Sequence, residues 1–231
     1  MHTAYFPNTL SQNSIIELDS EESWHLVKVA RIVNDEIIKV INGKGIIAEG
    51  IVKKAHPKAT QILITEAKEF LKSNHTLHLI VAPTKVNDRL EWMLEKAVEL
   101  GLNELSIIIT KRTERKKINI ERLYKIALAA AKQSKNPWLL KINEPSDFSQ
   151  FLKQDINGDG FIAHCDEGKE RLILKNYNIK GNVSVLIGPE GDFTKDEIEL
   201  AVQKGYKPAI LTHNILRAET AAIYVCSIFA K

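Results

Sequence analysis

The spacing of apolar residues changes near residue 72, and this change predicts two domains. Before it, short runs alternate between apolar and polar residues, as half-buried strands do. Glu36–Ile41 and Ile46–Val52 flank Asn42-Gly43, a pair that tolerates the positive φ of a tight hairpin turn. One short helix is expected at Glu21–Ala30. Because many short strands need protected edges, we predict a small closed or nearly closed β-barrel over residues 1–72.

Strands and helices alternate from residue 73 onward. A strand at Leu77–Ala82 is followed by an amphipathic helix over Asn87–Leu100 and by the β-branched strand Leu105–Ile109. This alternation predicts an α/β domain over residues 73–231, in which helices cover both faces of a parallel sheet. Further strands are expected at 138–142, 161–164, 183–187 and 209–211, and helices at 120–134, 147–153, 195–204 and 219–229.

Composition indicates a folded chain without a metal or disulfide framework. Of 231 residues, 44% are hydrophobic and 26% are charged, and the net charge is only +3, so any basic binding surface must be local. Cys165 and Cys226 are far apart and form no CxxC pair, so we expect neither a disulfide nor a metal site. The first residues carry no signal-peptide pattern, and no apolar run reaches the ~20 residues of a membrane span. We therefore expect a cytoplasmic protein that binds no membrane.

The strongest local motif is the stretch of residues 187–194, Ile-Gly-Pro-Glu-Gly-Asp-Phe-Thr. An apolar strand ends in a glycine-rich turn, and Thr194 with Glu197 forms a capping-box pattern that begins the next helix. Gly188 and Gly191 would let a ligand approach the backbone closely. In open α/β sheets, ligands bind where such loops leave the carboxyl ends of strands. The same pattern also fits an ordinary strand-to-helix connection, since glycine is common in turns.

A second strand-to-helix junction, residues 211–221, places Arg217 and Glu219 among apolar neighbours. Charged side chains are seldom enclosed unless they are paired or functional, so both are candidate functional groups. The alternative is that Arg217 only pairs with Glu190 or Glu219 and thereby ties two loops together.

Five of the seven residues in Lys111–Lys117 are basic, and more cations follow on the next helix. Clustered cations suit a nucleic-acid phosphate backbone. A run of charge is, however, more often a solvated surface. The candidate contacts are Lys111, Arg112, Arg115, Lys132 and Gln133, and Arg31 in the first domain extends the set.

Six sequence segments together resemble one family, the bacterial 16S rRNA uridine-N3 methyltransferases of the SPOUT, or α/β-knot, class. The segments follow the family's order over essentially the whole chain: HLVKVAR (25–31), EKAVELG (95–101), TER (113–115), AAKQS (130–134), IGPEGDF (187–193) and ILRAETA (215–221). The resemblance implies a PUA-like β-barrel that helps to hold RNA, followed by an α/β domain with a deep trefoil knot. It also implies a homodimer that uses S-adenosyl-L-methionine, without a metal, to methylate 16S rRNA of the small ribosomal subunit.

In this class the methyl donor lies among three loops, which correspond here to Phe161–Asp166, Leu186–Gly191 and Leu211–Arg217. The cofactor-binding residues that the resemblance implies are His164, Leu186, Ile187, Gly188, Gly191, Leu211, Ile215 and Leu216. Four positions near these loops depart from the family pattern: Asp192 and Thr212 each replace a glycine, Asn214 replaces an arginine and Ala218 replaces a threonine. The residue at 214 removes a possible contact with an RNA phosphate.

Arg217 is the candidate catalytic residue. A guanidinium directed at O2 or O4 of uracil would stabilise the negative charge that develops as N3 loses its proton. Glu219 or Glu190 would accept that proton or orient Arg217, and the sequence does not decide between them. Two other functions fit the same residues. One is a knot-fold protein that binds rRNA without catalysis, and the other is a methyltransferase of this class that acts on tRNA or on a ribose 2′-hydroxyl.

Overall fold

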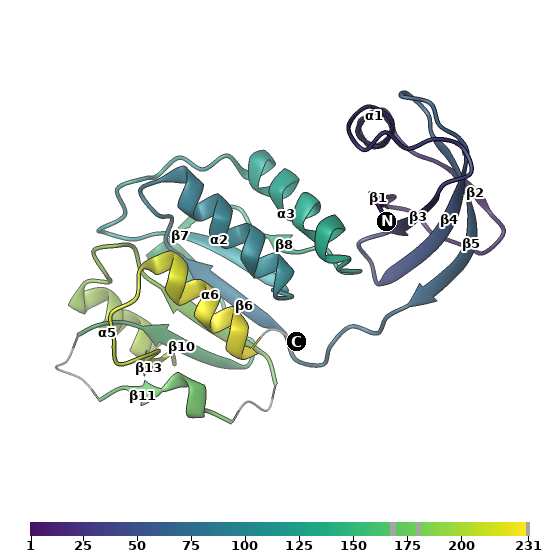
Figure 1. Cartoon of the computed structure of the whole chain (residues 1–231). Coiled ribbons are helices and arrows are strands. Elements are labelled where there is room, and N and C mark those ends of the chain that lie inside the picture. Colours follow the sequence, from purple (N-terminus) through teal and green to yellow (C-terminus); the bar gives the residue numbers. More distant parts are fainter. Residues whose placement is uncertain (167–169, 179–180, 230–231) are drawn as a thin grey trace. The chain divides into compact units, whose positions relative to one another are not determined.

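The chain divides into two compact units. The computed structural model describes residues 1–166, 170–178 and 181–229 (Figure 1). The first unit comprises Met1–Lys72 together with Leu128–Leu139, and the second comprises Ser73–Ala127 and Leu140–Lys231. The division expected from the sequence differs from this one in residues 128–139, which group with the first unit.

The first unit is built on a five-stranded sheet with the strand order β1-β3-β4-β5-β2. β1 runs parallel to β3, and all other neighbours are antiparallel. Within residues 1–72 the two edge strands do not pair with each other, so the sheet is a curled half-barrel that stays open between them (Figure 1). The strands are β1 (Thr3–Tyr5), β2 (Ile15–Glu17), β3 (Ile37–Ile41), β4 (Ile46–Lys54) and β5 (Gln61–Glu69).

The predicted hairpin is confirmed, because β3 and β4 pair on either side of the glycine-rich turn. Gly43 and Gly45 have φ of 70° and 101°, in the left-handed region that favours glycine. Both positions are also crowded. A Cβ atom at Gly43 would lie 2.5 Å from Leu139, and one at Gly45 would lie 2.5 Å from Trp138. This packing explains why the segment after the helix at 120–134 groups with the first unit.

The single helix expected in the first unit is also present. It begins as α1 (Ser20–Trp24), where the Asp19 side chain accepts a hydrogen bond from the N–H of Glu22 at 2.8 Å. It continues as one π-helical turn over His25–Val29. Leu26 is turned inward and is buried in the core of this unit.

A largely buried ion pair between Glu22 of this helix and Lys132 joins the two segments. The Lys132 ammonium donates to Glu22 Oε1 at 2.5 Å, and the N–H of Tyr5 donates to Glu22 Oε2 at 3.0 Å. The Lys132 and Glu22 side chains are 15% and 9% exposed. Both ions are therefore largely removed from water. Each would be a buried charge without a counterion if the other were removed, which is costly.

The second unit contains a parallel sheet with the strand order β11-β13-β10-β12-β6-β7-β8, and β9 pairs beside β7 (Figure 1). Its central strand β12 is buried along its whole length, as a parallel strand covered on both faces must be. The strands are β6 (Leu77–Val81), β7 (Glu104–Ile109), β8 (Lys141–Ile142), β9 (Ser146–Asp147), β10 (Asp159–Ala163), β11 (Leu172–Ile173), β12 (Val183–Ile187) and β13 (Lys207–Ile210).

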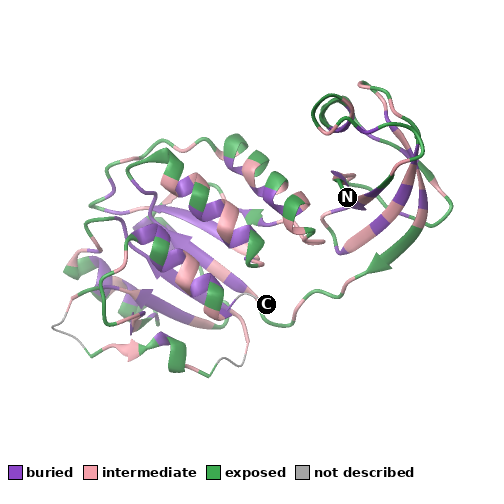
Figure 2. Cartoon of the chain, in the orientation of Figure 1, coloured by how far each residue is buried: buried purple, intermediate pink, exposed green. Residues whose placement is uncertain are grey.

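Helices cover both faces of this sheet, as predicted. α2 and α6 lie side by side over one face (Figure 1). On the other face, alternate strand residues such as Ile80 and Leu186 form a core with Phe151 of α4 and Ile198 of α5. Figure 2 shows buried strands beneath helices whose outer sides are exposed. The helices are α2 (Asn87–Glu99), α3 (Ile120–Ser134), α4 (Phe148–Phe151), a 3₁₀ turn (Leu174–Asn176), α5 (Lys195–Gln203) and α6 (Ala218–Phe229).

Two details of the second unit differ from the expectation. The strand expected over Trp138–Ile142 is shortened to β8, because Trp138 forms an isolated bridge with Lys44 in the first unit. β9 and β11 were not expected, since two residues are too few to show a period. In the part of the chain that the structure describes, no helix combines the length and apolar character needed to cross a bilayer.

We expect Lys132→Ala to lower the free energy of unfolding of the first unit by about 3 kcal/mol, because it leaves the Glu22 carboxylate buried without its cation. Urea unfolding followed by tryptophan fluorescence would measure this, since Trp24 and Trp138 belong to this unit. Lys54→Ala, at an exposed lysine of β4, is the control. Equal losses in the two variants would contradict a stabilising role for the ion pair.

Candidate functional site

Three neighbouring strands of the second unit end at one edge of the sheet. β13, β10 and β12 are adjacent and parallel, so the loops after Ala163, Ile187 and Ile210 leave the sheet side by side. These loops enclose a cavity of about 340 Å³. The position at which the sequence predicts a ligand site therefore coincides with a cavity.

Six of the eight residues expected to bind the cofactor line this cavity. They are His164, Ile187, Gly188, Leu211, Ile215 and Leu216. The other two lie elsewhere among the described residues. Leu186 is fully buried and packs in the core with Ile80, and Gly191 is exposed on the loop that follows β12.

The wall of the cavity also contains residues that the sequence did not assign. Arg171 lines it and donates from Nη1 to the carbonyl oxygen of His164 at 2.8 Å. Cys165 lies within one of the three expected loops, whereas nothing in the local pattern pointed to Arg171. In the described part of the chain, no three His, Cys, Asp or Glu side chains are grouped to hold a metal ion.

The two glycines of the 188–193 loop make room for neighbouring side chains. A Cβ atom at Gly188 would lie 3.1 Å from the Phe193 ring, and one at Gly191 would lie 3.3 Å from Cδ of Arg112. Larger residues at either position would displace these neighbours. Residues of the chain itself therefore lie beside both glycines, and the close approach of a ligand stays a prediction.

Asp192 fastens the 188–193 loop to the loop after β10. One carboxylate oxygen accepts a hydrogen bond from the N–H of Cys165 at 2.8 Å, and the other accepts one from the N–H of Phe193 at 2.7 Å. The φ of Asp192 is 61°, in the left-handed region, where glycine is favoured and aspartate is tolerated. The departure from the family's glycine therefore keeps the backbone conformation that a glycine would adopt.

The predicted capping box at the start of α5 is confirmed. The N–H of Glu197 donates to Thr194 Oγ1 at 3.3 Å, and the N–H of Thr194 donates to Glu197 Oε2 at 2.8 Å. Glu197 is buried, and its second oxygen accepts the N–H of Lys111 at 2.8 Å. This carboxylate therefore joins α5 to the segment that follows β7.

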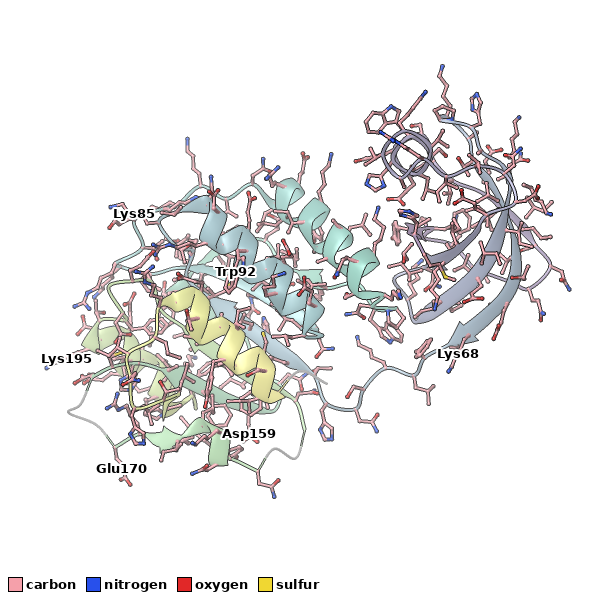
Figure 3. All side chains as sticks on the ribbon, viewed as in Figure 1. Lys68, Lys85, Trp92, Asp159, Glu170 and Lys195 are labelled. Atoms are coloured by element: carbon pink, nitrogen blue, oxygen red, sulfur yellow. The ribbon has the colours of Figure 1, made fainter. Side chains whose placement is uncertain are left out.

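The three candidate catalytic residues occupy different environments. Glu190 and Arg217 are exposed and line the cavity. Glu190 Oε1 accepts the N–H of Lys85 at 3.0 Å, just before α2 (Figure 3). Glu219 is buried outside the cavity lining, and its Oε1 lies 3.7 Å from Nη1 of Arg89.

Neither ion pair that we considered as an alternative for Arg217 is present. Within the described residues, the Arg217 side chain forms no ion pair or hydrogen bond, so neither Glu190 nor Glu219 neutralises it. A guanidinium without a partner at the wall of a cavity is free to meet an anionic or carbonyl group of a ligand.

The residues expected to contact RNA are divided between the two units and differ in their present contacts. Arg31 and Gln133 are exposed in the first unit, where Lys132 is held by Glu22. In the second unit, the Lys111 ammonium pairs with Asp196 at 2.8 Å, Arg112 donates to the carbonyl of Gly191 at 2.6 Å, and Arg115 Nε donates to the carbonyl of Lys117 at 3.3 Å. The charged groups of Lys111, Arg112, Arg115 and Lys132 thus all have partners within the protein.

The two cysteines differ in their expected reactivity. Burial, followed by the charge of Asp192, raises the pKa of Cys165, although Arg171 opposes this effect. Burial alone raises the pKa of Cys226 to about 12. Since the thiolate is the reactive form and a reagent must reach it, the exposed Cys165 at the cavity wall is expected to react faster than the buried Cys226.

Two family models match the chain, one in each part. A model described as an RNA methyltransferase domain matches residues 71–230, and one described as an RNA methyltransferase PUA domain matches residues 18–65. Together they account for most of the sequence and for both kinds of sheet.

Relatives of similar length share the whole architecture. A Rickettsia conorii protein named ribosomal RNA small subunit methyltransferase E is 34% identical, covering 95% of this chain and 91% of its own. The crystal structure of a probable rRNA methyltransferase from Porphyromonas gingivalis has a TM-score of 0.86 at 30% identity, covering 98% of this chain and 95% of that one. A Legionella pneumophila protein described as a putative methyltransferase in complex with the cofactor SAM has a TM-score of 0.87 at 26% identity, with the same coverage.

We expect iodoacetamide at about pH 8 to alkylate Cys165 and to leave Cys226 unmodified. Asp192→Asn should increase the rate at Cys165 roughly threefold, because it removes the negative charge that, together with the larger effect of burial, raises the pKa of the thiol. Peptide mass spectrometry over a time course would measure both rates. If the Asp192→Asn protein reacts no faster than the unaltered protein, the carboxylate does not control this thiol.

Proposed function

This chain belongs to the family of ribosomal RNA small subunit methyltransferases E, and from that premise we propose that it uses S-adenosyl-L-methionine to methylate N3 of a uridine in 16S rRNA. The observation that carries the proposal is the cavity at the ends of β10, β12 and β13, with Glu190 and Arg217 in its wall. The family establishes methylation of ribosomal RNA. The choice of a uridine as the target and of N3 as the methylated atom is the finer part of the proposal, and the chemistry of Glu190 and Arg217 supports it.

The lining of the cavity suits the proposed cofactor. S-adenosyl-L-methionine, when bound, supplies an electrophilic methyl carbon on a positively charged sulfur. Ile187 and Leu211 offer apolar surface for an adenosine group, while Asp192 and Arg171 offer both signs of charge for a zwitterionic amino acid. The cofactor of the Legionella pneumophila neighbour adds support from a protein that this chain matches over nearly its whole length.

Arg217 is proposed as the catalytic residue. Uracil N3 is a poor nucleophile while it is protonated, and the negative charge that develops on its loss of a proton spreads to O2 and O4. The Arg217 guanidinium has no partner in the described residues and lines the cavity, so it is available to donate hydrogen bonds to such an oxygen. An interaction that strengthens as charge develops lowers the barrier more than it stabilises the bound substrate.

The geometry favours Glu190 over Glu219 as the group that accepts the N3 proton. Glu190 is exposed at the cavity and uses one oxygen to accept the N–H of Lys85, which orients the carboxylate. Glu219 is buried beside Arg89 and does not line the cavity. A general base must lie within hydrogen-bond reach of the proton that it removes, and only Glu190 borders the space in which a pyrimidine would bind.

RNA binding is proposed for three cations and one glutamine that are divided between the two units. Lys111 and Arg115 belong to the second unit, and Arg31 and Gln133 belong to the first, which contains the part that matches a PUA domain model of RNA methyltransferases. Surface cations attract the phosphate backbone without reading sequence, so they would position the RNA and leave base recognition to the cavity.

A homodimer is proposed as the working form, as the family resemblance implies. Trp92 on α2 (Figure 3) is 46% exposed, and Ile215 at the cavity is 83% exposed. Large apolar side chains of this kind are common in protein interfaces, and a second copy that covers Ile215 would also shield the neighbouring Arg217 from water. The trefoil knot of the same class stays a prediction.

The modified nucleoside is the most direct test of the proposal. Nucleosides from 16S rRNA of cells with and without this protein should differ by N3-methyluridine in mass spectrometry, and the purified protein should restore it. A methylated ribose or a methylated tRNA would identify a different substrate for the same fold. No change in any nucleoside, together with no calorimetric heat on titration with S-adenosyl-L-methionine, would indicate a protein that binds rRNA without catalysis.

Arg217→Ala should lower the rate of methyl transfer at least ~100-fold, because it removes the group that stabilises the developing charge. Calorimetric titration should show that the variant still binds S-adenosyl-L-methionine, since Arg217 is assigned to the pyrimidine. Arg217→Lys, which keeps the charge and loses the planar fork, should be intermediate. Near-normal turnover of the alanine variant would remove Arg217 from the mechanism.

A further inference from the structure

The basic segment Lys111–Lys117 is attached to the residues that follow β12. It begins just after β7, and the N–H of Lys111 donates to the buried Glu197 carboxylate at 2.8 Å. The segment is also closed on itself, since Thr113 Oγ1 accepts the N–H of Thr110 at 2.9 Å. Thr113 is buried, which fixes this turn against the unit. The backbone of the basic segment is therefore held in place beside the 188–193 loop.

Arg112 makes the direct contact with that loop. Its Nη1 donates to the carbonyl oxygen of Gly191 at 2.6 Å and lies 3.4 Å from that of Phe193. Its aliphatic stem covers Gly191, where an added Cβ would lie 3.3 Å from Cδ and 3.5 Å from Cβ of Arg112. A hydrogen bond from a charged group is stronger than one between neutral groups. The Arg112 side chain thus donates to the backbone carbonyls of the residues on both sides of Asp192.

Asp192 continues this chain of contacts to the opposite wall of the cavity. Its carboxylate accepts the N–H of Cys165, so a shift of Gly191 or Phe193 would also move the loop after β10. Asp192 and Cys165 both line the cavity, whereas Arg112 does not. Arg112 therefore acts on the cavity from outside, through the backbone on either side of Asp192.

We propose that Arg112 is a positioning residue that holds the 188–193 loop in the conformation that binds the cofactor. The proposal rests on the function proposed above, because it assumes that S-adenosyl-L-methionine occupies this cavity. The sequence predicts, from charge, that Arg112 contacts RNA. The proposal gives this side chain a structural role in the protein instead.

Lys111 provides a matched control one residue away. It carries the same charge, is exposed like Arg112, and pairs with Asp196, an exposed residue of α5 that does not line the cavity. Removing the Lys111 ammonium leaves in place the hydrogen bond from the backbone N–H of Lys111 to the Glu197 carboxylate. The two neighbours therefore separate an effect on the cofactor loop from a loss of positive charge.

The test uses the full chain with Arg112→Met and Lys111→Met. Methionine keeps an apolar stem over Gly191 and removes only the guanidinium. Calorimetric titration with S-adenosyl-L-methionine in the absence of RNA should give a Kd about tenfold higher for Arg112→Met, and a Kd within about twofold of the unaltered protein for Lys111→Met. Arg112→Lys should recover part of the affinity, because a lysine can donate to one carbonyl.

A second measurement identifies where the change occurs. In the protein without ligand, backbone hydrogen exchange should become faster over residues 188–193 in Arg112→Met and remain unchanged there in Lys111→Met. In steady-state assays, Arg112→Met should raise the KM for the cofactor and leave the KM for RNA nearly unchanged. A general loss of stability would instead accelerate exchange throughout the unit.

The outcomes separate this proposal from the proposed function. If the unaltered protein binds no S-adenosyl-L-methionine, the proposed function fails. If it binds and Arg112→Met binds equally well with unchanged loop exchange, the role of Arg112 is wrong. If Arg112→Met has an unchanged Kd for the cofactor and a raised KM for RNA, Arg112 contacts RNA and does not position the cofactor loop. Should Arg112→Met not fold, Arg112→Lys is judged by the same Kd and exchange measurements, with a raised Kd expected and an unaltered one contradicting the proposal.

Discussion

The candidate site depends on the register of three parallel strands. Ala163 of β10 pairs with Ile187 of β12 on one side and with Ala209 of β13 on the other, so the three strands end at nearly the same level. Parallel neighbours cannot be joined by tight turns, and each must continue into a loop that leads to a distant part of the chain. Three such loops beginning side by side leave a space between them. The cavity is therefore a consequence of strand order and register, and its chemistry comes from the few side chains that the loops carry.

These loops are held by carboxylates that accept backbone N–H groups from other segments. Glu190 accepts from Lys85, Asp192 from Cys165 and Glu197 from Lys111. All three carboxylates come from one short stretch, and each reaches a different segment of the unit. Ordering a loop costs conformational entropy, and charge-assisted hydrogen bonds offset part of that cost. The acidic residues after β12 thus have a structural role in addition to any part they take in proton transfer.

Local sequence patterns predicted the helices and strands well. The site was harder to predict, because its side chains contact residues that are far away in the sequence. The apolar period placed the helix at 120–134 with the bounds that the structure shows, and the capping box located the start of α5. No local pattern could reveal that Lys132 is held by Glu22, 110 residues away, or that Arg112 bonds to a carbonyl 79 residues away. Charge alone assigned both cations to RNA. Their partners become visible only when the strands and helices are assembled.

The start of α6 shows how one local structure separates two charged residues. The N–H of Ala221 donates to the carbonyl of Arg217 at 2.8 Å, so Arg217 lies just before the helix and Glu219 within its first turn. An anion is favoured in that turn by the helix dipole, and the nearby Arg89 of α2 adds a second favourable charge. Glu219 is consequently buried where α6 meets α2, and the residue two positions earlier extends to the cavity. The start of α6 thus places Glu219 on the buried side of the helix and Arg217 at the cavity.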